Sequence, residues 1–209
     1  MRNQDGLTCG EWIEALKMTA NVAPVKAVPG RSQDGSHCRR CRSEFESLAH
    51  VLGVCPFNEV LRNSRHHKIR KIIADSLRKC GLEVYEEVHG LANDRSSRRI
   101  DIIAINRKSN SGTIIDPTIR VETHLSQPEE VHIEKSNIYK ETVPYYKNKY
   151  NLKEINVIGL MVGARGTITT KFVTFCKQYG VTKKTIKQIS LSALKDSIKI
   201  LRNHLYNNF

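Results

Sequence analysis

The sequence lacks the features of several protein classes. It has no apolar run of the roughly 18 to 20 residues that a membrane-spanning helix requires. Its first residues, MRNQDGLTCGEWIEALK, are too polar for a secretory signal peptide. It also has no internal repeat, low-complexity tract or heptad array. We therefore expect a soluble, intracellular protein with no membrane partner.

Acidic residues are outnumbered by basic ones. The chain has 34 Lys and Arg against 21 Asp and Glu, a formal net charge of +13, and the basic residues extend from Arg2 to Arg202. Such a charge indicates a polyanionic partner, of which nucleic acid is the commonest. Charge alone leaves open a basic soluble protein without that role. The length of 209 residues allows one main domain and a small additional module.

The cysteines do not have the even spacing of a disulfide framework, because three of the six cluster between positions 38 and 55. The segment Cys38-x2-Cys41-x8-His50-x4-Cys55 supplies three thiolates and one imidazole, the donor set of a structural zinc site. We favour His50 as the nitrogen donor because its spacing to Cys55 fits the end of a short helix. Buried cysteines beside a non-ligating histidine are the alternative. Other candidate nitrogen donors are His37, His66 and His67.

Basic residues lie within this finger and on the segment that follows it. Arg39, Arg40 and Arg42 surround the first cysteine pair, where they would lower the thiol pKa values and face a phosphate backbone. From 58 to 80, apolar residues recur with a helical period, and the positions between them are rich in Lys and Arg. The candidate nucleic-acid-binding residues on this helix are Arg62, Arg65, Lys68 and Lys71.

The remaining pattern predicts an α/β fold with three segments: an N-terminal helix and linker at 1 to 30, the finger at 31 to 60 and a main domain at 61 to 209. Strands are expected at 82 to 88, 100 to 105, 113 to 122 and 155 to 163. Further helices are expected at 9 to 20, 128 to 150, 171 to 179 and 183 to 206. The order from 58 to 163 is therefore helix, three strands, helix, strand.

Two aspartates interrupt the apolar strands. Asp101 begins the run IDIIAI and Asp116 lies within TIIDPTIRVE, and a turn between the strands would bring both carboxylates to the same end of the sheet. A buried carboxylate is costly to desolvate, and a divalent cation compensates for that cost. Hard oxygen donors select Mg²⁺ or Mn²⁺, which polarise a phosphate and lower the pKa of the attacking water. Without a metal, Asp101 would pair with Arg98 or Arg99, and Asp116-Pro117 would be an edge-strand bulge.

Two further residues complete the candidate site. Glu122 lies six residues after Asp116, on the same strand face by parity, and is a candidate ligand or base. Lys135, in the following helix, is a candidate for neutralising the charge that develops on the phosphate. Lys140 is the alternative lysine.

Several segments together resemble a known family. They are HCRRC, ESLAHVLGVCP, LRNSRHHKIRKIIA, RIDIIAI, IIDPTIRVE, VGARGTI and SALKDSIKILRNHLY. They resemble the C-terminal part of the polyprotein of site-specific non-LTR retrotransposons that insert into ribosomal RNA genes of arthropods, and the resemblance extends over nearly the whole chain. In that family a Cys-Cys-His-Cys zinc finger precedes an endonuclease similar to restriction enzymes, of the PD-(D/E)-x-K type. The resemblance therefore implies this fold, with an αβββαβ core and C-terminal helices.

The resemblance also implies roles for individual residues. The two acidic residues of the family's motif fall on Asp101 and Asp116, and a following glutamate falls on Glu122. The lysine, which this family places on the next helix, falls on Lys135. Where a proline usually precedes the first aspartate this chain has Ile100, a change that leaves the ligand in place. Position 118 is threonine where the wider superfamily has its lysine, so catalysis would depend on the lysine of the helix.

By this resemblance the chain is a metal-dependent endonuclease of the nucleus, with structural Zn²⁺ and catalytic Mg²⁺ or Mn²⁺. It would nick double-stranded target DNA and leave a 3′-hydroxyl that primes reverse transcription of the element RNA, a second expected partner. Reverse transcriptase activity is not expected, because the sequence has no paired-aspartate polymerase motif. The alternative is a catalytically inactive nucleic-acid-binding fragment of the polyprotein.

Overall fold

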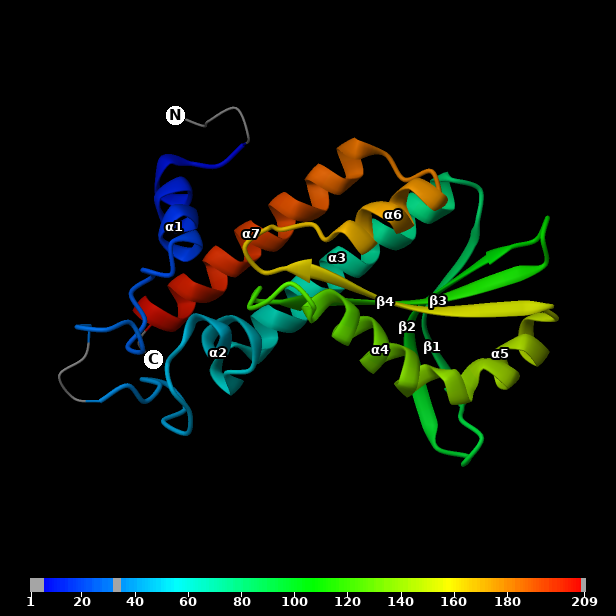
Figure 1. The fold of residues 1–209 in the computed structure, drawn as a ribbon, viewed down its shortest axis with the longest axis horizontal. Coiled ribbons are helices and arrows are strands. Elements are labelled where there is room, and N and C mark those ends of the chain that lie inside the picture. The colour runs from blue at the N-terminus through cyan, green and yellow to red at the C-terminus, as the bar shows by residue number, and fades with distance from the viewer. Residues whose placement is uncertain (1–5, 32–34, 208–209) are drawn as a thin grey trace.

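Four strands form one mixed sheet in the computed structural model, which describes residues 6–31 and 35–207 (Figure 1). The strands lie in the order β1 (Glu83–Leu91), β2 (Ser97–Asn106), β3 (Ser111–Arg120) and β4 (Glu154–Gly163). The β1–β2 and β2–β3 pairs are antiparallel, whereas β3 and β4 are parallel. The α/β class is confirmed, and so is the order helix, three strands, helix, strand, except that two helices precede the last strand.

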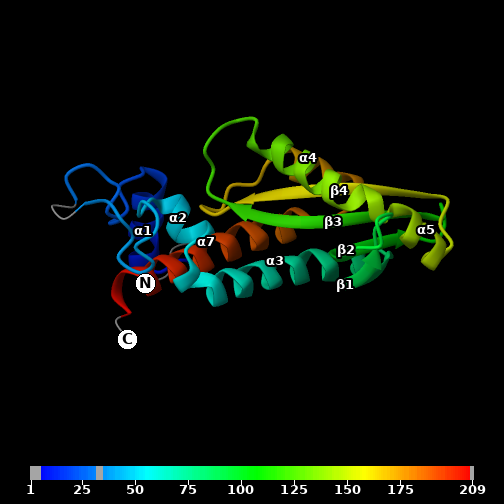
Figure 2. The ribbon, with the colours of Figure 1, turned by 90° about the horizontal axis from the view of Figure 1, so that it is seen from below.

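Helices cover both faces of the sheet (Figure 2). α3 (Glu59–Lys79) and α7 (Lys183–Tyr206) lie on one face, α4 (Gln127–Tyr139) and α5 (Val143–Tyr150) lie on the other, and α6 (Thr170–Gln178) lies beside β4. Ile102 of β2 packs with α3, α6 and α7, whereas Ile103 and Ile105 pack with Tyr139 and Tyr146. Because alternate side chains point to opposite faces, burial on both faces explains the continuous apolar run of β2.

One expected helix is divided into two. We predicted a single helix at 128 to 150, but α4 ends at Tyr139, a 3-10 turn covers Lys140–Thr142, and α5 begins at Val143. Pro144 explains the break, because a proline has no N–H to donate to a carbonyl of the preceding turn. The prediction was therefore wrong at this position. Within the described parts of the chain, no helix combines the length and hydropathy of a membrane span.

The N-terminal segment and the finger pack against the end of α7. α1 (Cys9–Thr19), α2 (Leu48–Gly53) and the C-terminal half of α7 share one apolar cluster that includes Met18, Leu52 and Leu201. The views in Figures 1 and 2 both place these elements together at one end of the molecule. The segments that we expected as separate units therefore share a core at this end.

Gly159 allows α4 to lie close to the sheet. It is paired with Asp116 in the β3–β4 ladder. A Cβ atom at position 159 would lie 2.8 Å from the carbonyl oxygen of Val131 and 2.9 Å from the Cβ atom of Lys135. Only glycine lacks this atom, so α4 approaches β4 more closely here than any other residue would allow. The approach places Lys135 Nζ 3.3 Å from Asp116 Oδ2.

Replacing Gly159 with alanine should push α4 away from β4. We expect the free energy of unfolding to fall by about 1 to 3 kcal/mol, the usual cost of overpacking, in urea denaturation. Gly53→Ala is the matched control, since no atom beyond its chain neighbours and the backbone of its own helix lies within 4 Å of the Cβ position there. An unchanged unfolding free energy in Gly159→Ala would contradict the close approach.

Candidate functional site

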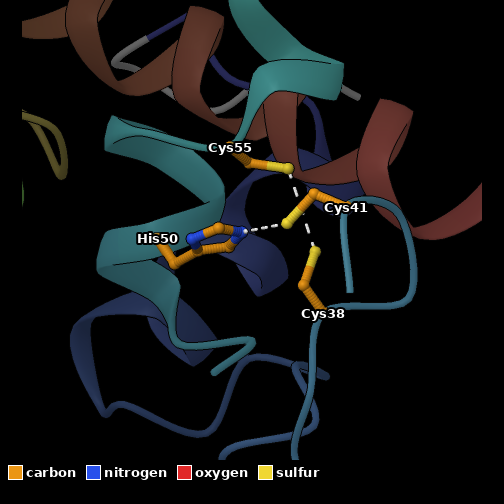
Figure 3. A group of neighbouring side chains, drawn as sticks. All are labelled: Cys38, Cys41, His50 and Cys55. Atoms are coloured by element: carbon orange, nitrogen blue, oxygen red, sulfur yellow. Dashed lines mark hydrogen bonds between the residues drawn. The ribbon is translucent and has the colours of Figure 1, made fainter. Parts of the chain in front are cut away.

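The four predicted zinc ligands, Cys38, Cys41, His50 and Cys55, converge in the finger (Figure 3). Their ligand atoms all lie within 4.8 Å of one another. The Sγ atoms of Cys38 and Cys55 are 3.8 Å apart, and Cys41 Sγ is 3.3 Å from His50 Nε2. Zinc–sulfur bonds of about 2.3 Å in a tetrahedron give sulfur–sulfur separations of about 3.8 Å. The donor set and its spacing therefore fit a metal ion such as zinc.

Local backbone structure positions these ligands. The first cysteine pair lies on a tight turn, in which the Arg42 N–H donates to the Cys38 carbonyl at 3.0 Å. The Ser47 hydroxyl caps α2 by accepting a hydrogen bond from the His50 N–H. Cys55 follows the end of α2, and its N–H donates to the His50 carbonyl at 2.9 Å. The short helix thus sets the separation of the imidazole from the last thiol.

The thiols differ in acidity. Burial opposes ionisation of Cys41, but hydrogen bonds with Ser43 outweigh burial and lower the pKa of this thiol to about 6. Burial, together with the neighbouring thiols, raises the pKa of Cys55 to about 12. A bound cation would therefore be needed to hold Cys55 as a thiolate near neutral pH. The other candidate nitrogen donors have different partners: the His37 ring lies tilted against the Phe45 ring, His66 contacts Asp101 and His67 contacts Glu87.

Two of the three arginines beside the first cysteine pair have partners inside the protein. Arg39 donates to the Glu46 carboxylate through Nε and Nη2 at 2.7–3.0 Å. Burial opposes ionisation of Glu46, but these hydrogen bonds outweigh it and lower the pKa of Glu46 to about 2. Arg40 Nε donates to the His204 carbonyl at 2.7 Å. Arg42 is exposed, whereas Arg39 and Arg40 are only partly exposed.

A second group of predicted residues lines a cleft where the sheet divides. β2 and β3 pair from Asn106↔Ser111 to Ile102↔Ile115. Beyond that point β2 remains paired with β1, and β3 remains paired with β4. Asp101 and Asp116 are the next residues of the two strands, so both lie at this fork. They line a cleft of about 350 Å³, together with residues of α3 and α4.

Asp116 is almost completely buried, with 4% of its surface exposed. The Tyr139 hydroxyl donates to its Oδ2 at 2.9 Å, and Lys135 Nζ lies 3.3 Å from the same oxygen. The Thr118 hydroxyl donates to Oδ1 at 3.2 Å. Burial raises the pKa of Asp116, whereas the charge of Lys135 lowers it and that of Asp101 raises it further. The two carboxylates therefore interact, and a shared cation would relieve their repulsion.

Asp101 turns toward α3, where His66 Nε2 lies 3.2 Å from its Oδ2. The side-chain alternation of β2 is interrupted here, because Ile100 packs on the same side of the sheet as Ile103. Glu87 of β1, between the pairs Glu86↔Ile102 and Val88↔Ile100, has a left-handed φ of 52°. The irregularity in β1 lies directly beside Asp101. The alternative partners of Asp101 are engaged elsewhere: Arg98 with the Ser97 carbonyl and Arg99 with Glu87.

Glu122 lies outside this cleft. β3 ends at Arg120, so the strand parity that we used to place Glu122 beside Asp116 does not extend to it. Its Oε2 accepts a hydrogen bond from Arg165 Nε at 3.0 Å, and its side chain packs on Gly163. The prediction that Glu122 joins the two aspartates was therefore wrong in its geometry.

The cleft contains one of the two candidate lysines and two residues that we did not predict there. Lys140 is exposed and contacts Asn137, so Lys135 is the lysine at the cleft. Tyr139 lies four residues after Lys135 on the same helix face, and this spacing could have placed Tyr139 beside the candidate lysine. Burial and the charge of Asp116 raise the pKa of Tyr139, which keeps its hydroxyl a donor. His66 entered the sequence analysis only as an alternative zinc ligand.

Arginines give the cleft an electropositive wall. Arg62, Arg65 and Arg99 line it beside the two aspartates. Arg65 is only 3% exposed and donates to the Ser197 hydroxyl and the Leu52 carbonyl. Burial and repulsion by Arg62 lower the pKa of Arg65 to about 10. Arg65 is therefore a cleft residue rather than part of an exposed helix face as we expected.

The two lysines predicted on α3 to bind nucleic acid are exposed, but each is paired with an aspartate. Lys68 Nζ lies 3.0 Å from Asp196 Oδ2, and Lys71 Nζ lies 3.2 Å from Asp75 Oδ2. Exposed ion pairs of this kind contribute little to stability. Both lysines therefore remain accessible to a phosphate.

Comparison with known proteins finds a similarity to a retrotransposon polyprotein. No known protein-family profile matches the chain. The retrovirus-related Pol polyprotein from type-1 retrotransposable element R2 of Popillia japonica is 26% identical over 208 residues. The chain is similar to a retrotransposon Pol polyprotein. The match covers 95% of this chain and 39% of that polyprotein, so the chain spans well under half the length of this relative.

A likeness among solved structures is more distant. The crystal structure of a protein of unknown function is 11% identical and gives a TM-score of 0.33. The match covers 67% of this chain and 96% of that chain. The similarity to the Pol polyprotein, by contrast, supports a retrotransposon-related function.

Removing the metal should unfold the finger, because ligation supplies the folding free energy of such small modules. We expect one zinc ion per chain by elemental analysis. A chelator that removes it should speed amide hydrogen exchange within residues 35–58. Cys41→Ser should lower the zinc content, whereas Cys80→Ser, outside the finger, should leave it unchanged. Retained amide protection in the zinc-free protein would refute this prediction.

Asp116→Asn should stabilise the protein when no Mg²⁺ or Mn²⁺ is bound at the cleft. Because the folded-state pKa of Asp116 is raised, its ionised form opposes folding at neutral pH. This destabilisation of the folded state by ionised Asp116 is complete at pH values above the raised pKa. It disappears as the pH falls from the raised pKa to the ordinary pKa of aspartate. We expect a gain of about 0.5 to 2 kcal/mol at pH 7, measured by thermal unfolding of the zinc-loaded protein in buffer without Mg²⁺ or Mn²⁺, and a smaller gain at acidic pH.

Asp75→Asn is the matched control for this measurement. Burial opposes ionisation of Asp75, but the hydrogen bonds and charges of Lys71 and Arg78 together outweigh it and lower the pKa of Asp75, so the substitution should not stabilise the protein. If Asp116→Asn were no more stable than the wild type at pH 7, burial of the ionised Asp116 carboxylate would not destabilise the folded protein.

Proposed function

We propose that this chain is a metal-dependent endonuclease and that the cleft at the sheet fork is its active site. The observation that carries the proposal is that Asp101, Asp116 and Lys135 line one cleft beside an arginine wall. Two carboxylates suit a hard divalent cation, and guanidinium groups suit phosphate oxygens. The proposed fold is the restriction-endonuclease-like αβββαβ core, with which the order of elements agrees.

The residues of the cleft fit the chemistry of phosphodiester hydrolysis. Asp101 and Asp116 would hold Mg²⁺ or Mn²⁺, which polarises the scissile phosphate and lowers the pKa of the attacking water. Tyr139 and Thr118 hold the Asp116 carboxylate in one orientation by donating to its two oxygens. Lys135 would neutralise the negative charge that develops on the phosphate, since its ammonium group already lies at this carboxylate.

Arg62 and Arg65 would hold the phosphate against the metal ligands. Arg62 Nη1 donates to the Gly53 carbonyl at 2.6 Å, and Arg65 donates to a carbonyl and a hydroxyl. Because these partners are neutral, both arginines keep their positive charge available at the cleft. Arg42, Lys68 and Lys71 would contact the nucleic acid backbone outside it.

The proposed substrate is double-stranded target DNA. A nick leaves a 3′-hydroxyl, which in a retrotransposon polyprotein would prime reverse transcription of the element RNA. The similarity to a Pol polyprotein of element R2 supports this context. In this context the protein would act in the nucleus and would also contact element RNA.

Relaxation of a supercoiled plasmid tests the activity. With Mg²⁺ or Mn²⁺ the wild type should nick the plasmid, and Asp116→Asn should lower the nicking rate by at least about 100-fold, as expected for loss of a group that acts on transition-state charge. Lys135→Ala should lower the rate to a similar extent. Asp75→Asn on the outer face of α3 is the control and should nick at the wild-type rate.

Two results would count against the enzyme. Equal nicking by Asp116→Asn and the wild type would show that the activity does not arise at this cleft. DNA binding by the wild type, without nicking in either metal, would favour the alternative of an inactive nucleic-acid-binding fragment.

A further inference from the structure

His204, in the last turn of α7, is buried beside the finger's metal ligands. Its side chain is completely buried, and Nε2 lies 3.7 Å from Cys38 Sγ and 3.3 Å from Glu46 Oε2. Cys38 and His204 are 166 positions apart in the sequence. The finger ligand and the C-terminal helix therefore meet through a tertiary contact.

The hydrogen bonds around Asn58 determine which nitrogen of His204 carries the proton. Asn203 Nδ2 donates to Asn58 Oδ1 at 3.0 Å, so the amide oxygen of Asn58 faces Asn203. Its amide nitrogen then donates to the Val51 carbonyl and to His204 Nδ1, each at 3.1 Å. Because Nδ1 accepts, the neutral imidazole has its proton on Nε2, the nitrogen that faces Cys38 and Glu46.

We propose that His204 is a positioning residue of the finger's metal centre, where its Nε2–H donates to the Cys38 thiolate. The proposal rests on the zinc site described above. Glu46 already accepts hydrogen bonds from Arg39 Nε and Nη2, from the Arg39 N–H and from the Lys26 N–H. A buried thiolate at Cys38 needs a donor, and His204 supplies one from outside the finger.

Metal binding would then fix the C-terminal turn of α7 on the finger. Two further contacts converge on this turn, since Arg40 donates to the His204 carbonyl and the Arg40 guanidinium lies 4.6 Å from the centre of the Phe57 ring. Phe57 in turn meets the His204 ring edge to face. The ion therefore connects the finger with a helix of the main domain rather than closing an isolated loop.

Variants at position 204 test the proposal in the full chain. His204→Ala should weaken zinc binding about 10- to 100-fold, the usual effect of removing a hydrogen-bond partner of a metal ligand, in competition with a chromogenic chelator. With Co²⁺ in place of zinc, the thiolate-to-metal charge-transfer band should move to lower energy, because a thiolate that loses a hydrogen bond is a stronger donor. His204→Gln, whose amide nitrogen can donate from a similar position, should recover most of both properties.

Arg202→Ala is the matched control. Arg202 lies in the same turn, is exposed and pairs with Glu14 of α1, so its loss should leave affinity and absorption band unchanged. Amide exchange at residues 198–206 should rise when zinc is removed from the wild type, and should already be raised in zinc-loaded His204→Ala.

The outcomes distinguish a failure of the proposed role of His204 from a failure of the zinc site on which it rests. If the wild type binds zinc and Co²⁺ but His204→Ala matches it in affinity and in the absorption band, His204 does not act on the metal centre and the zinc site stands. If the wild type binds neither ion, the zinc site and the role of His204 both fail. Plasmid nicking through Asp116 is measured independently of either result.

Discussion

The early end of the β2–β3 ladder is the constraint on which the cleft depends. A ladder continued past Ile102↔Ile115 would place Asp101 directly opposite Asp116, and like charges in that relation are destabilising. The strands separate there instead, while β3 continues beside β4 as far as Arg120↔Gly163. Both carboxylates line one cleft at this separation, and α3 and α4 reach the cleft from opposite faces of the sheet.

α3 connects this fork to the finger through two consecutive residues. Arg65 holds the Leu52 carbonyl of α2 and the Ser197 hydroxyl of α7, and the next residue, His66, contacts Asp101. Both belong to one helix of 21 residues, an element about 30 Å long with little freedom to bend. α3 therefore contacts both the finger and the cleft. Nucleic acid bound at the finger would lie at a set distance from the carboxylates.

The sequence was sufficient where short-range pattern decides the structure. The apolar runs around Asp101 and Asp116 predicted two strands, and the cysteine spacing predicted a cluster that the structure contains. The sequence was insufficient where contacts between residues far apart in the chain decide the position of a side chain. Glu122 follows the end of β3 and pairs with Arg165, 43 positions away. Arg65 is buried, and one of its hydrogen bonds is accepted by Ser197, 132 positions away. Neither partner can be identified from local spacing.

These distant contacts also determine where positive charge is available. Arg39, Lys68 and Lys71 each pair with a carboxylate, which offsets much of their charge. Arg62 and Arg65 are hydrogen-bonded only to carbonyl and hydroxyl oxygens among the partners described for them. Burial and repulsion by Arg62 lower the pKa of Arg65, so a bound anion would stabilise this pair of guanidinium groups. An anion bound there would lie in the same cleft as Asp101 and Asp116. A cation in that cleft would relieve the repulsion between these two carboxylates. A metal ion and a phosphate would thus stabilise each other in this cleft, because the ion would offset the repulsion between the two carboxylates and the phosphate would offset the repulsion between the two guanidinium groups.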